Sequence, residues 1–387
     1  MRLIIVTSHP IQYQAPLFRR LASEVELTVF FAHRASAMEQ ATAGFNVPFN
    51  WDIDLLSGYR HQFLSNLSRS PGVNRFGGCD TPEIGRQLDA IGCDAVLVTG
   101  WYLKSFWQAI WAAKIRGIPI LVRGDSHLQT PRSRVKRAMK QLAYPVGLRC
   151  FRAALYVGKR SREYYEYYHV QPDRLFFSPH CVDTHWFAER ATLKARHDVR
   201  ARLSIGGEEK VVLFVGKLLE LKRPLDVIHA AARLRQMGSP VSVLMAGSGP
   251  LFGRIQREAI AAKVPIHMLG FQNQTRMPAI YAAADILVLP SESETWGLVA
   301  NEALACGKPI VVSDAVGCAP DLAADNLAGR EFPVGNCDRF ASAIHDLIAR
   351  PPKPDAIAAK AKAYGLTAAA EGIVKALQTI LSPECAR

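Results

Sequence analysis

Two glutamates, Glu294 and Glu302, have the type and spacing that best suit chemistry in this sequence. An ionised carboxylate accepts hydrogen bonds from a vicinal diol on both of its oxygens, so one group could bind a sugar and the other a ribose. The simpler interpretation is that both only flank a helix N-terminus, where the helix dipole favours negative charge.

The stretch around these glutamates, Leu289–Val312, predicts a strand, a loop, a helix and a second strand. The apolar run Ile286–Leu289 stops at Pro290, as a buried strand does when it enters a loop. A helix is expected to begin near Gly297 and to stop at Gly307, before the strand Ile310–Val312. The free amide groups at such a helix N-terminus suit a phosphate.

Two lysines follow an earlier predicted strand, Val211–Gly216. Lys217 and Lys222 precede a predicted helix, Leu225–Arg235, and form a cationic clamp suited to a diphosphate. A further strand, Val241–Ala246, runs into Gly247-Ser248-Gly249-Pro250. Its Gly-x-Gly does not continue as a dinucleotide fingerprint, because Phe252 breaks the spacing.

The spacing of Glu294 and Glu302, with the helix, Ala-Cys-Gly, Pro and strand that follow, resembles the Glu-x7-Glu signature of retaining glycosyltransferase family 4. Lys217 and Lys222 match the two cations of the family's Gly-Arg/Lys-Leu…Lys-Gly element, although Arg223-Pro224 replaces the usual Gly. The resemblance is strong over about residues 208–325 and thin over the first half. There, His180-Cys181 replaces the Asn-Gly of a family turn.

The resemblance implies an α/β protein of GT-B architecture, with two facing doubly wound (Rossmann-like) parallel-sheet domains. The implied reaction moves a sugar from a nucleotide diphosphate sugar with retention, without a metal or a cofactor. Glu302 would bind the ribose and Glu294 the donor sugar, neither acting as a nucleophile, while Lys217, Lys222 and the amides after Gly297 would stabilise the leaving diphosphate. The other donor-binding residues implied are Trp296, Leu298, Gly216, Gly247, Gly249 and Phe271.

In the first half, polar residues follow two predicted strands. The strand Leu3–Thr7 ends in a loop that directs His9 toward a site at the sheet edge, unless His9 is only a turn residue. The strand Pro119–Gly124 is followed by Asp125 and His127, which could position or deprotonate an acceptor hydroxyl. Asp125 could instead cap the next helix.

Asp52-Ile53-Asp54 is an Asp-x-Asp triplet, and in another class of sugar transferase a triplet of this kind holds a metal. Here the alternation over Trp51–Leu55 predicts a short strand, so we expect no metal site.

The segment Thr130–Arg152 contains basic residues and no acid. Its cations are Arg132, Arg134, Lys136, Arg137, Lys140, Arg149 and Arg152, and Val135, Met139, Leu142 and Ala143 repeat at helical spacing. Such a helix could lie on an anionic bilayer, or it could pack its apolar side into its own domain.

The composition limits the classes of protein that remain. The net charge of +13 is uneven, with a surplus of 9 in residues 1–183 and of 4 in residues 184–387. We find no nucleic-acid recognition module, so a membrane surface or a phosphate-bearing acceptor explains the basic half better. No apolar run reaches the roughly 18 residues of a membrane span, and the N-terminal run is too short for a signal peptide. The eight Cys form no Cys-x-x-Cys pair, so neither a zinc site nor a disulfide framework is indicated.

The resemblance implies an acceptor-binding domain at residues 1–190, a linker near 184–207, a donor-binding domain at 207–365 and a C-terminal helix, 366–387, that crosses back to the first domain. The tail from Ala356 to Leu381 is expected to be helical. We expect a cytoplasmic glycosyltransferase, peripheral on the inner face of the membrane, that uses a glycan or lipid-linked acceptor in surface polysaccharide or glycolipid synthesis. The alternatives are a nucleotide-sugar hydrolase or epimerase on the same fold, or a non-catalytic membrane-associated scaffold.

Overall fold

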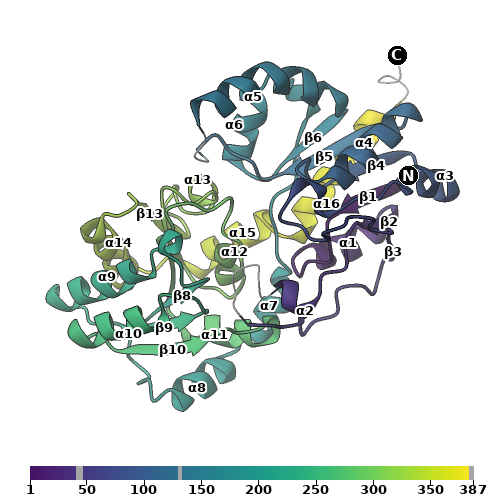
Figure 1. Ribbon diagram of the computed structural model, residues 1–387. Coiled ribbons are helices and arrows are strands. Elements are labelled where there is room, and N and C mark those ends of the chain that lie inside the picture. Colours follow the sequence, from purple (N-terminus) through teal and green to yellow (C-terminus); the bar gives the residue numbers. More distant parts are fainter. Residues whose placement is uncertain (41–46, 130–132, 383–387) are drawn as a thin grey trace. The chain divides into compact units, whose positions relative to one another are not determined.

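The computed structural model describes residues 1–40, 47–129 and 133–382, which form two compact units, each built on a parallel β-sheet (Figure 1). The first unit contains residues 1–36, 54–181 and the chain from 366 onward, and the second contains residues 37–53 and 182–365. Two doubly wound α/β units are the fold class that the sequence predicts.

In the described residues, the sheet of the first unit has seven parallel strands in the order β3-β2-β1-β4-β5-β6-β7. Their bounds are β1 (Arg2–Thr7), β2 (Glu26–Phe31), β3 (Arg60–Phe63), β4 (Ala95–Val98), β5 (Ile120–Gly124), β6 (Ala153–Tyr156) and β7 (Leu175–Phe177). The strand order reverses between β1 and β4. In such sheets ligands bind beyond the carboxyl ends of the strands at this point.

Helices cover both faces of this first sheet. They are α1 (Gln14–Ala22), α3 (Ile84–Ile91), α4 (Lys104–Ile115), α5 (Arg134–Gly147), α6 (Lys159–Tyr167) and α16 (Leu366–Leu381). Leu3 and Ile5 of β1 share an apolar cluster with α1 and α16, while Ile4 and Val6 share another with α3, α4 and α6. The alternation follows from the strand geometry, and it explains why β1 is apolar throughout.

The sheet of the second unit has six parallel strands among the described residues, in the order β10-β9-β8-β11-β12-β13. Their bounds are β8 (Val211–Val215), β9 (Ser242–Ala246), β10 (Ile266–Gly270), β11 (Ile286–Leu289), β12 (Ile310–Ser313) and β13 (Gly329–Phe332). The order reverses between β8 and β11. The loops after these two strands are therefore the expected ligand-binding loops.

The helices of the second unit include two in the segment predicted to be a linker. They are α2 (Ala37–Gln40), α7 (Thr184–Arg190), α8 (Leu193–Arg202), α9 (Pro224–Gln236), α10 (Phe252–Ala261), α11 (Met277–Ala283), α12 (Leu298–Ala305), α13 (Ala319–Leu322), α14 (Cys337–Ala349) and α15 (Pro354–Ala363). Within the described ranges, no helix of either unit is long and apolar enough to cross a membrane.

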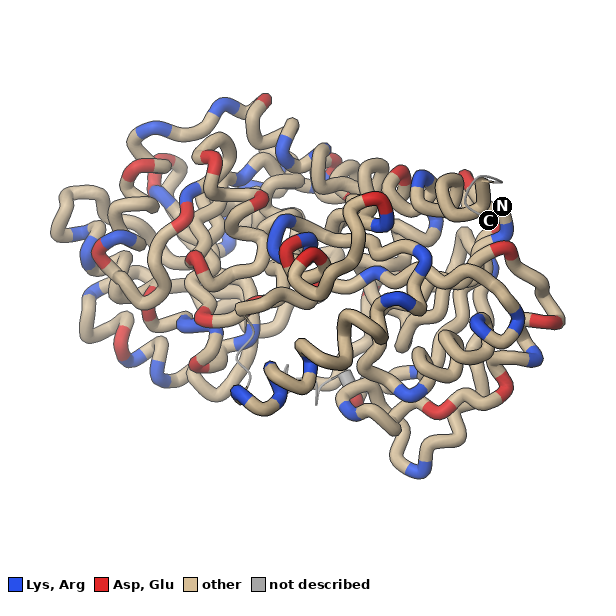
Figure 2. The backbone as a smooth tube through the Cα atoms, turned by 90° about the horizontal axis from the view of Figure 1, so that it is seen from above, with Lys and Arg blue, Asp and Glu red and all other residues tan. Residues whose placement is uncertain are grey.

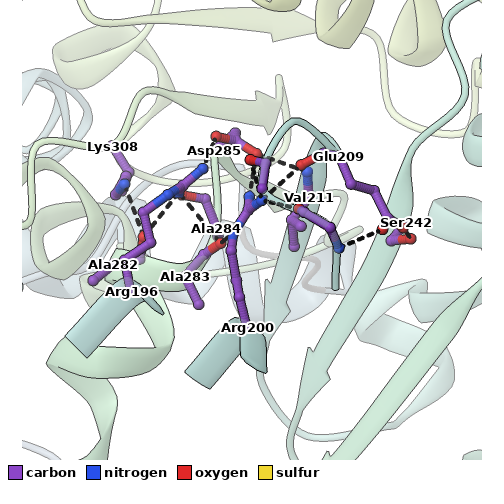
Figure 3. Close-up of polar contacts among 12 residues, drawn as sticks. Arg196, Arg200, Glu209, Val211, Ser242, Ala282, Ala283, Ala284, Asp285 and Lys308 are labelled. Carbon is purple, nitrogen blue, oxygen red and sulfur yellow. Dashed lines mark hydrogen bonds and ion pairs between the residues drawn. The ribbon is translucent and has the colours of Figure 1, made fainter. Parts of the chain in front are cut away.

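The predicted linker near residues 184–207 carries two helices of the second unit, and ion pairs hold α8 to the second sheet. Arg196 and Arg200 of α8 donate to Asp285, at 2.9 Å and 2.8 Å, just before β11 begins (Figure 3). Asp285 also accepts from the backbone N–H of Val211 at the start of β8, at 2.8 Å. A single carboxylate thus links α8 to the two strands on either side of the order reversal.

The tail is helical as predicted, in two helices, because α15 ends at Ala363 and α16 begins at Leu366. One other local prediction is corrected. Residues 51–55 form no strand: the carboxylate of Asp52 accepts from the N–H of Thr275 at 3.1 Å, and that of Asp54 accepts from the N–H of Leu56 at 2.9 Å. Each carboxylate thus organises a turn, in a different unit.

The predicted basic helix starts later than expected. Its described part, α5, begins at Arg134, and Ser133 caps it by accepting from the N–H of Lys136. Residues 130–132 of the predicted segment, including Arg132, lie outside the described residues.

Candidate functional site

The loops after β8 and β11 lie side by side at the point where the strand order of the second sheet reverses. The backbone N–H of Glu292, in the loop after β11, donates to the carbonyl of Leu221, in the loop after β8, at 2.9 Å. A third loop, after β12, supports them: the N–H of Gly317 donates to the carbonyl of Glu294 at 3.0 Å. A Cβ on Gly317 would lie 1.9 Å from the carbonyl oxygen of Thr295, so this contact requires glycine.

The charged groups of these loops meet. The ammonium group of Lys222 forms an ion pair with the carboxylate of Glu294, and both side chains are largely buried. Burial lowers the pKa of Lys217, and the neighbouring charge of Lys222 lowers it further, while Glu294 opposes both effects. Two cations against one carboxylate leave a net positive site, which an anionic diphosphate would stabilise.

Glu302 lies in the second turn of α12 and is buried. One of its carboxylate oxygens accepts from the hydroxyl of Tyr281, on α11, at 2.6 Å. Burial raises the pKa of Glu302 to about 7, although hydrogen bonds from Tyr281 and Gln274 favour the ionised form. A carboxyl of this kind can gain or lose its proton near neutral pH, and when ionised it can accept hydrogen bonds from a diol.

Glycines allow the loops after β8 and β9 to approach each other closely. The N–H of Gly216 donates to the carbonyl of Ala246, and a Cβ on Gly247 would lie 1.8 Å from the carbonyl oxygen of Gly216. A Cβ on Gly249 would lie 2.6 Å from the carbonyl oxygen of Leu218. The predicted glycines thus allow the close backbone contacts next to Lys217.

Gly297 and its neighbours form the start of α12. Gly297 has a φ of 101°, a region that favours glycine, and it precedes the first helical residue, Leu298, which is half-buried. Trp296 is buried, with its indole N–H donating to the side chain of Asn301 at 2.8 Å. Trp296 therefore supports the loop from within.

Phe271 directly follows β10, and it packs on Phe49 with ring centroids 4.5 Å apart. A cavity of about 600 Å³ opens beside it, lined in part by Asp52, Gln272 and Arg276. The side chain of Asn273 also donates to the carbonyl of Asn50, at 2.7 Å. The segment around residues 49–52 therefore braces the loop after β10, which the sequence pattern did not indicate.

In the first unit, Asp125 is paired with a residue that the sequence analysis did not select. Its carboxylate lies 3.5 Å from Nε2 of His180, which follows β7, and the rings of His180 and Tyr13 are nearly perpendicular with centroids 6.0 Å apart. Burial lowers the pKa of His180, against the opposing effect of Asp125, while the Asp125 side chain is 43% exposed. Asp125 does not cap α5, since Ser133 does so.

The two predicted histidines of this unit are placed differently. His127 is buried, and His9 lies at the end of β1 with its Nδ1 2.9 Å from the hydroxyl of Ser8. His180 had one signal in the sequence: it follows a strand, at the edge where Asp125 and His9 also lie.

One group of possible metal ligands occurs among the described residues. Donor atoms of Asp226, His229 and Cys337 lie within 4.8 Å of one another. The carboxylate of Asp226 already pairs with Arg223, at 2.7 Å, so a cation there would have to compete with the guanidinium.

The comparisons with known proteins bear on the second unit first. Residues 195–364 match the family model of glycosyl transferases group 1. This group 1 segment contains Lys217, Lys222, Glu294 and Glu302, and it includes every strand of the second sheet.

Two curated relatives and one solved structure extend the similarity. The chain is 32% identical over 231 residues to the D-inositol 3-phosphate glycosyltransferase of Frankia alni, covering 56% of each protein. It is 36% identical over 159 residues to that of Mycobacteroides abscessus, covering 39% of this chain and 34% of the relative. The matches thus span about a third to a half of the length of these relatives.

The solved structure is Anabaena Alr3699/HepE in complex with UDP, with a TM-score of 0.74, 14% identity and coverage of 98% of this chain and all of that one. At this identity the likeness concerns the fold. Both parallel-sheet units are therefore those of a GT-B fold, as the sequence resemblance implies.

Proposed function

We propose that this chain is a retaining, metal-independent glycosyltransferase of family 4 that moves a sugar from a nucleotide diphosphate sugar to a glycan or lipid-linked acceptor. The observation that carries the proposal is the convergence of Lys217, Lys222 and Glu294 at the order reversal of the second sheet, inside the group 1 segment. Fold similarity alone does not establish a function, so the proposal depends on these side chains.

The proposed roles follow from charge and position. Lys217, Lys222 and the amides that open α12 stabilise the negative charge that develops on the leaving diphosphate. Two lysines supply there the positive charge that a divalent ion supplies in other transferases. Glu294 accepts hydrogen bonds from the donor sugar, in place of its present pairing with Lys222.

Glu302 binds the ribose diol in this proposal, held in place by Tyr281. Gly216, Gly247 and Gly249 keep side chains away from the diphosphate, and the loop at Phe271 holds the base. Uridine diphosphate sugars are the first donors to test, because Anabaena Alr3699/HepE was solved with UDP.

The first unit is proposed to bind the acceptor, with Asp125 as the group that receives the proton of the acceptor hydroxyl. His180 orients that carboxylate and remains neutral, because burial lowers its pKa. We propose a role in surface polysaccharide or glycolipid synthesis on the cytoplasmic side of a membrane.

The test is to incubate the protein with labelled nucleotide sugars, with and without glycans and lipid extracts as acceptors. The proposal is supported if transfer requires an acceptor and if NMR of the product shows that the anomeric configuration is retained. Because the Asp125 carboxylate is accessible, it could also activate water. Free sugar or an epimer formed without acceptor would favour the hydrolase or epimerase alternative and count against transfer.

A further inference from the structure

Helix α5 of the first unit exposes a continuous apolar stripe. Val135, Met139, Leu142 and Val146 are 69%, 64%, 81% and 67% exposed. Their spacing of three to four residues places all four on one side of the helix. An exposed apolar stripe of this length is uncommon on a protein surface that has no partner.

The stripe faces away from the unit that carries it. Tyr144, on the other side of α5, accepts a hydrogen bond from the indole N–H of Trp101 at 3.2 Å, and Leu148, just after α5, is buried. At about 100° per residue, positions 144 and 148 lie roughly half a turn from the centre of the stripe. The side of α5 that packs inward is therefore opposite the apolar one. The expectation that the apolar side packs into its own domain is wrong.

The charges beside the stripe have one sign. Arg134 and Lys136 lie about 100° to either side of it, and no Asp or Glu occurs between residues 130 and 152. Figure 2 shows basic and acidic positions mixed over much of the rest of the described chain. Long basic side chains beside an apolar stripe can extend to phosphate groups while the apolar residues enter the acyl region.

A cavity continues the stripe at the C-terminal end of α5. It has a volume of about 680 Å³ and is lined by Val146 of the stripe, by Trp107 and Trp111 of α4, and by Lys114, Arg149 and Arg152. Trp111 is 55% exposed, and Ile115, one turn farther along α4, is 80% exposed. Indole rings beside cationic groups are typical of the boundary between headgroups and acyl chains.

We propose that the stripe of α5 and this cavity together dock the first unit on an anionic lipid bilayer. The four stripe residues enter the boundary region, the cations contact lipid phosphates, and the cavity receives part of a lipid. A second copy of the chain is a poorer occupant, because two such stripes in contact would bring their flanking cations together without any acid between them. The inference does not depend on the proposed transfer reaction.

The experiment is co-sedimentation of the full chain with vesicles, in the absence of nucleotide. Vesicles of phosphatidylcholine mixed with phosphatidylglycerol should bind the wild type, and vesicles of phosphatidylcholine alone should bind it much more weakly. The double variant M139E/L142E should lose binding to both, by about tenfold or more, because it introduces charge into the acyl region. The variant R134Q/K136Q should reduce the preference for anionic lipid and leave binding to phosphatidylcholine alone unchanged.

The matched control is Ile260→Glu, which makes the same kind of change at an exposed apolar residue of α10 in the second unit, and it should bind like the wild type. Binding that is absent in the wild type, or equal in M139E/L142E and the control, would overturn the proposal. So would self-association that needs the stripe, measured by sedimentation equilibrium. A thermal shift with nucleotide sugars, without vesicles, tests the donor site separately, so either proposal can fail alone.

Discussion

Lys222 and Glu294, 72 residues apart in the sequence, form an ion pair at the point where the strand order of the second sheet reverses. The pair exists because β8 and β11 are neighbours in the sheet, which brings the loops after them together. Lys222, a cation suited to a phosphate, and Glu294, a carboxylate suited to a sugar, are thus in direct contact.

This pairing predicts coupling in a double-mutant cycle. Lys222→Met and Glu294→Gln should each lower the free energy of unfolding by about 1 kcal/mol, because each leaves a largely buried partner without its counter-charge. The double variant should lose less than the sum of the two, measured by urea denaturation. Strictly additive losses would mean that the ion pair contributes nothing in solution.

Glu302 predicts a pH dependence of stability. Its pKa is raised from 4.5 to about 7 in the folded chain, so between these values the unfolded chain releases a proton that the folded chain retains. The contribution of Glu302 to stability is therefore complete at pH values below 4.5 and is lost as the pH rises through about 7. Urea midpoints of Glu302→Gln should fall less over this range than those of the wild type.

Glu292→Gln, at an exposed glutamate of the loop after β11, is the control for this pH series. Its midpoints should follow those of the wild type, and a Glu302→Gln series that does the same would contradict the raised pKa. In the proposed function, donor affinity should also increase as the pH rises through about 7, since only the ionised carboxylate accepts both hydrogen bonds of a diol.

The close backbone contact at Gly247 predicts that a single added methyl group strongly destabilises the fold. Gly247→Ala would place a Cβ 1.8 Å from the carbonyl oxygen of Gly216, so the loops after β8 and β9 must separate. We expect the free energy of unfolding, measured by chemical denaturation, to fall by about 3 kcal/mol or more. Gly238→Ala is the control, since Gly238 also has a positive φ but open space around its Cβ position. Equal losses in both would assign the effect to φ alone.

Asp125 predicts a loss of turnover without a loss of donor binding. Asp125→Asn removes the proposed proton acceptor, and we expect kcat to fall by about a hundredfold or more with an unchanged donor dissociation constant. His180→Gln should reduce turnover less and should shift the pH profile, because it changes the partner of that carboxylate. Asp173→Asn, at an exposed acid of the same unit, should retain full activity. A loss of donor binding in Asp125→Asn would contradict this assignment.

Local patterns in the sequence predict the loops after β8 and β11 well, but they do not predict which side chains of these loops are in contact. The apolar run of β11, Pro290 and Gly297 mark the strand, the loop and the helix start, because each acts on its own backbone. The pairing of Lys222 with Glu294 depends on strand order, and that of Asp125 with His180 depends on two strands separated by β6. A local pattern carries no information on either.

The errors have the same origin. Helix α8 lies in the segment predicted to be a linker, and no local pattern indicates the contact of Arg196 and Arg200 with Asp285 that holds it to the second sheet. Asp52 lies in an alternating pattern typical of a strand, but its carboxylate braces Thr275, more than 200 positions later. Both contacts are long-range, and they override the local preference.

The central claim is that the group 1 segment binds a nucleoside diphosphate through Lys217 and Lys222. The most direct measurement is calorimetric titration of UDP, GDP and ADP into the wild type, Lys217→Met, Lys222→Met and Lys210→Met. Lys210 precedes β8 at the opposite end of the strand, so its variant removes a charge away from the site. We expect one nucleotide to bind the wild type and Lys210→Met equally, and the other two variants about tenfold or more weakly. Absence of binding by all three nucleotides, or an equal loss in all three variants, would contradict the account.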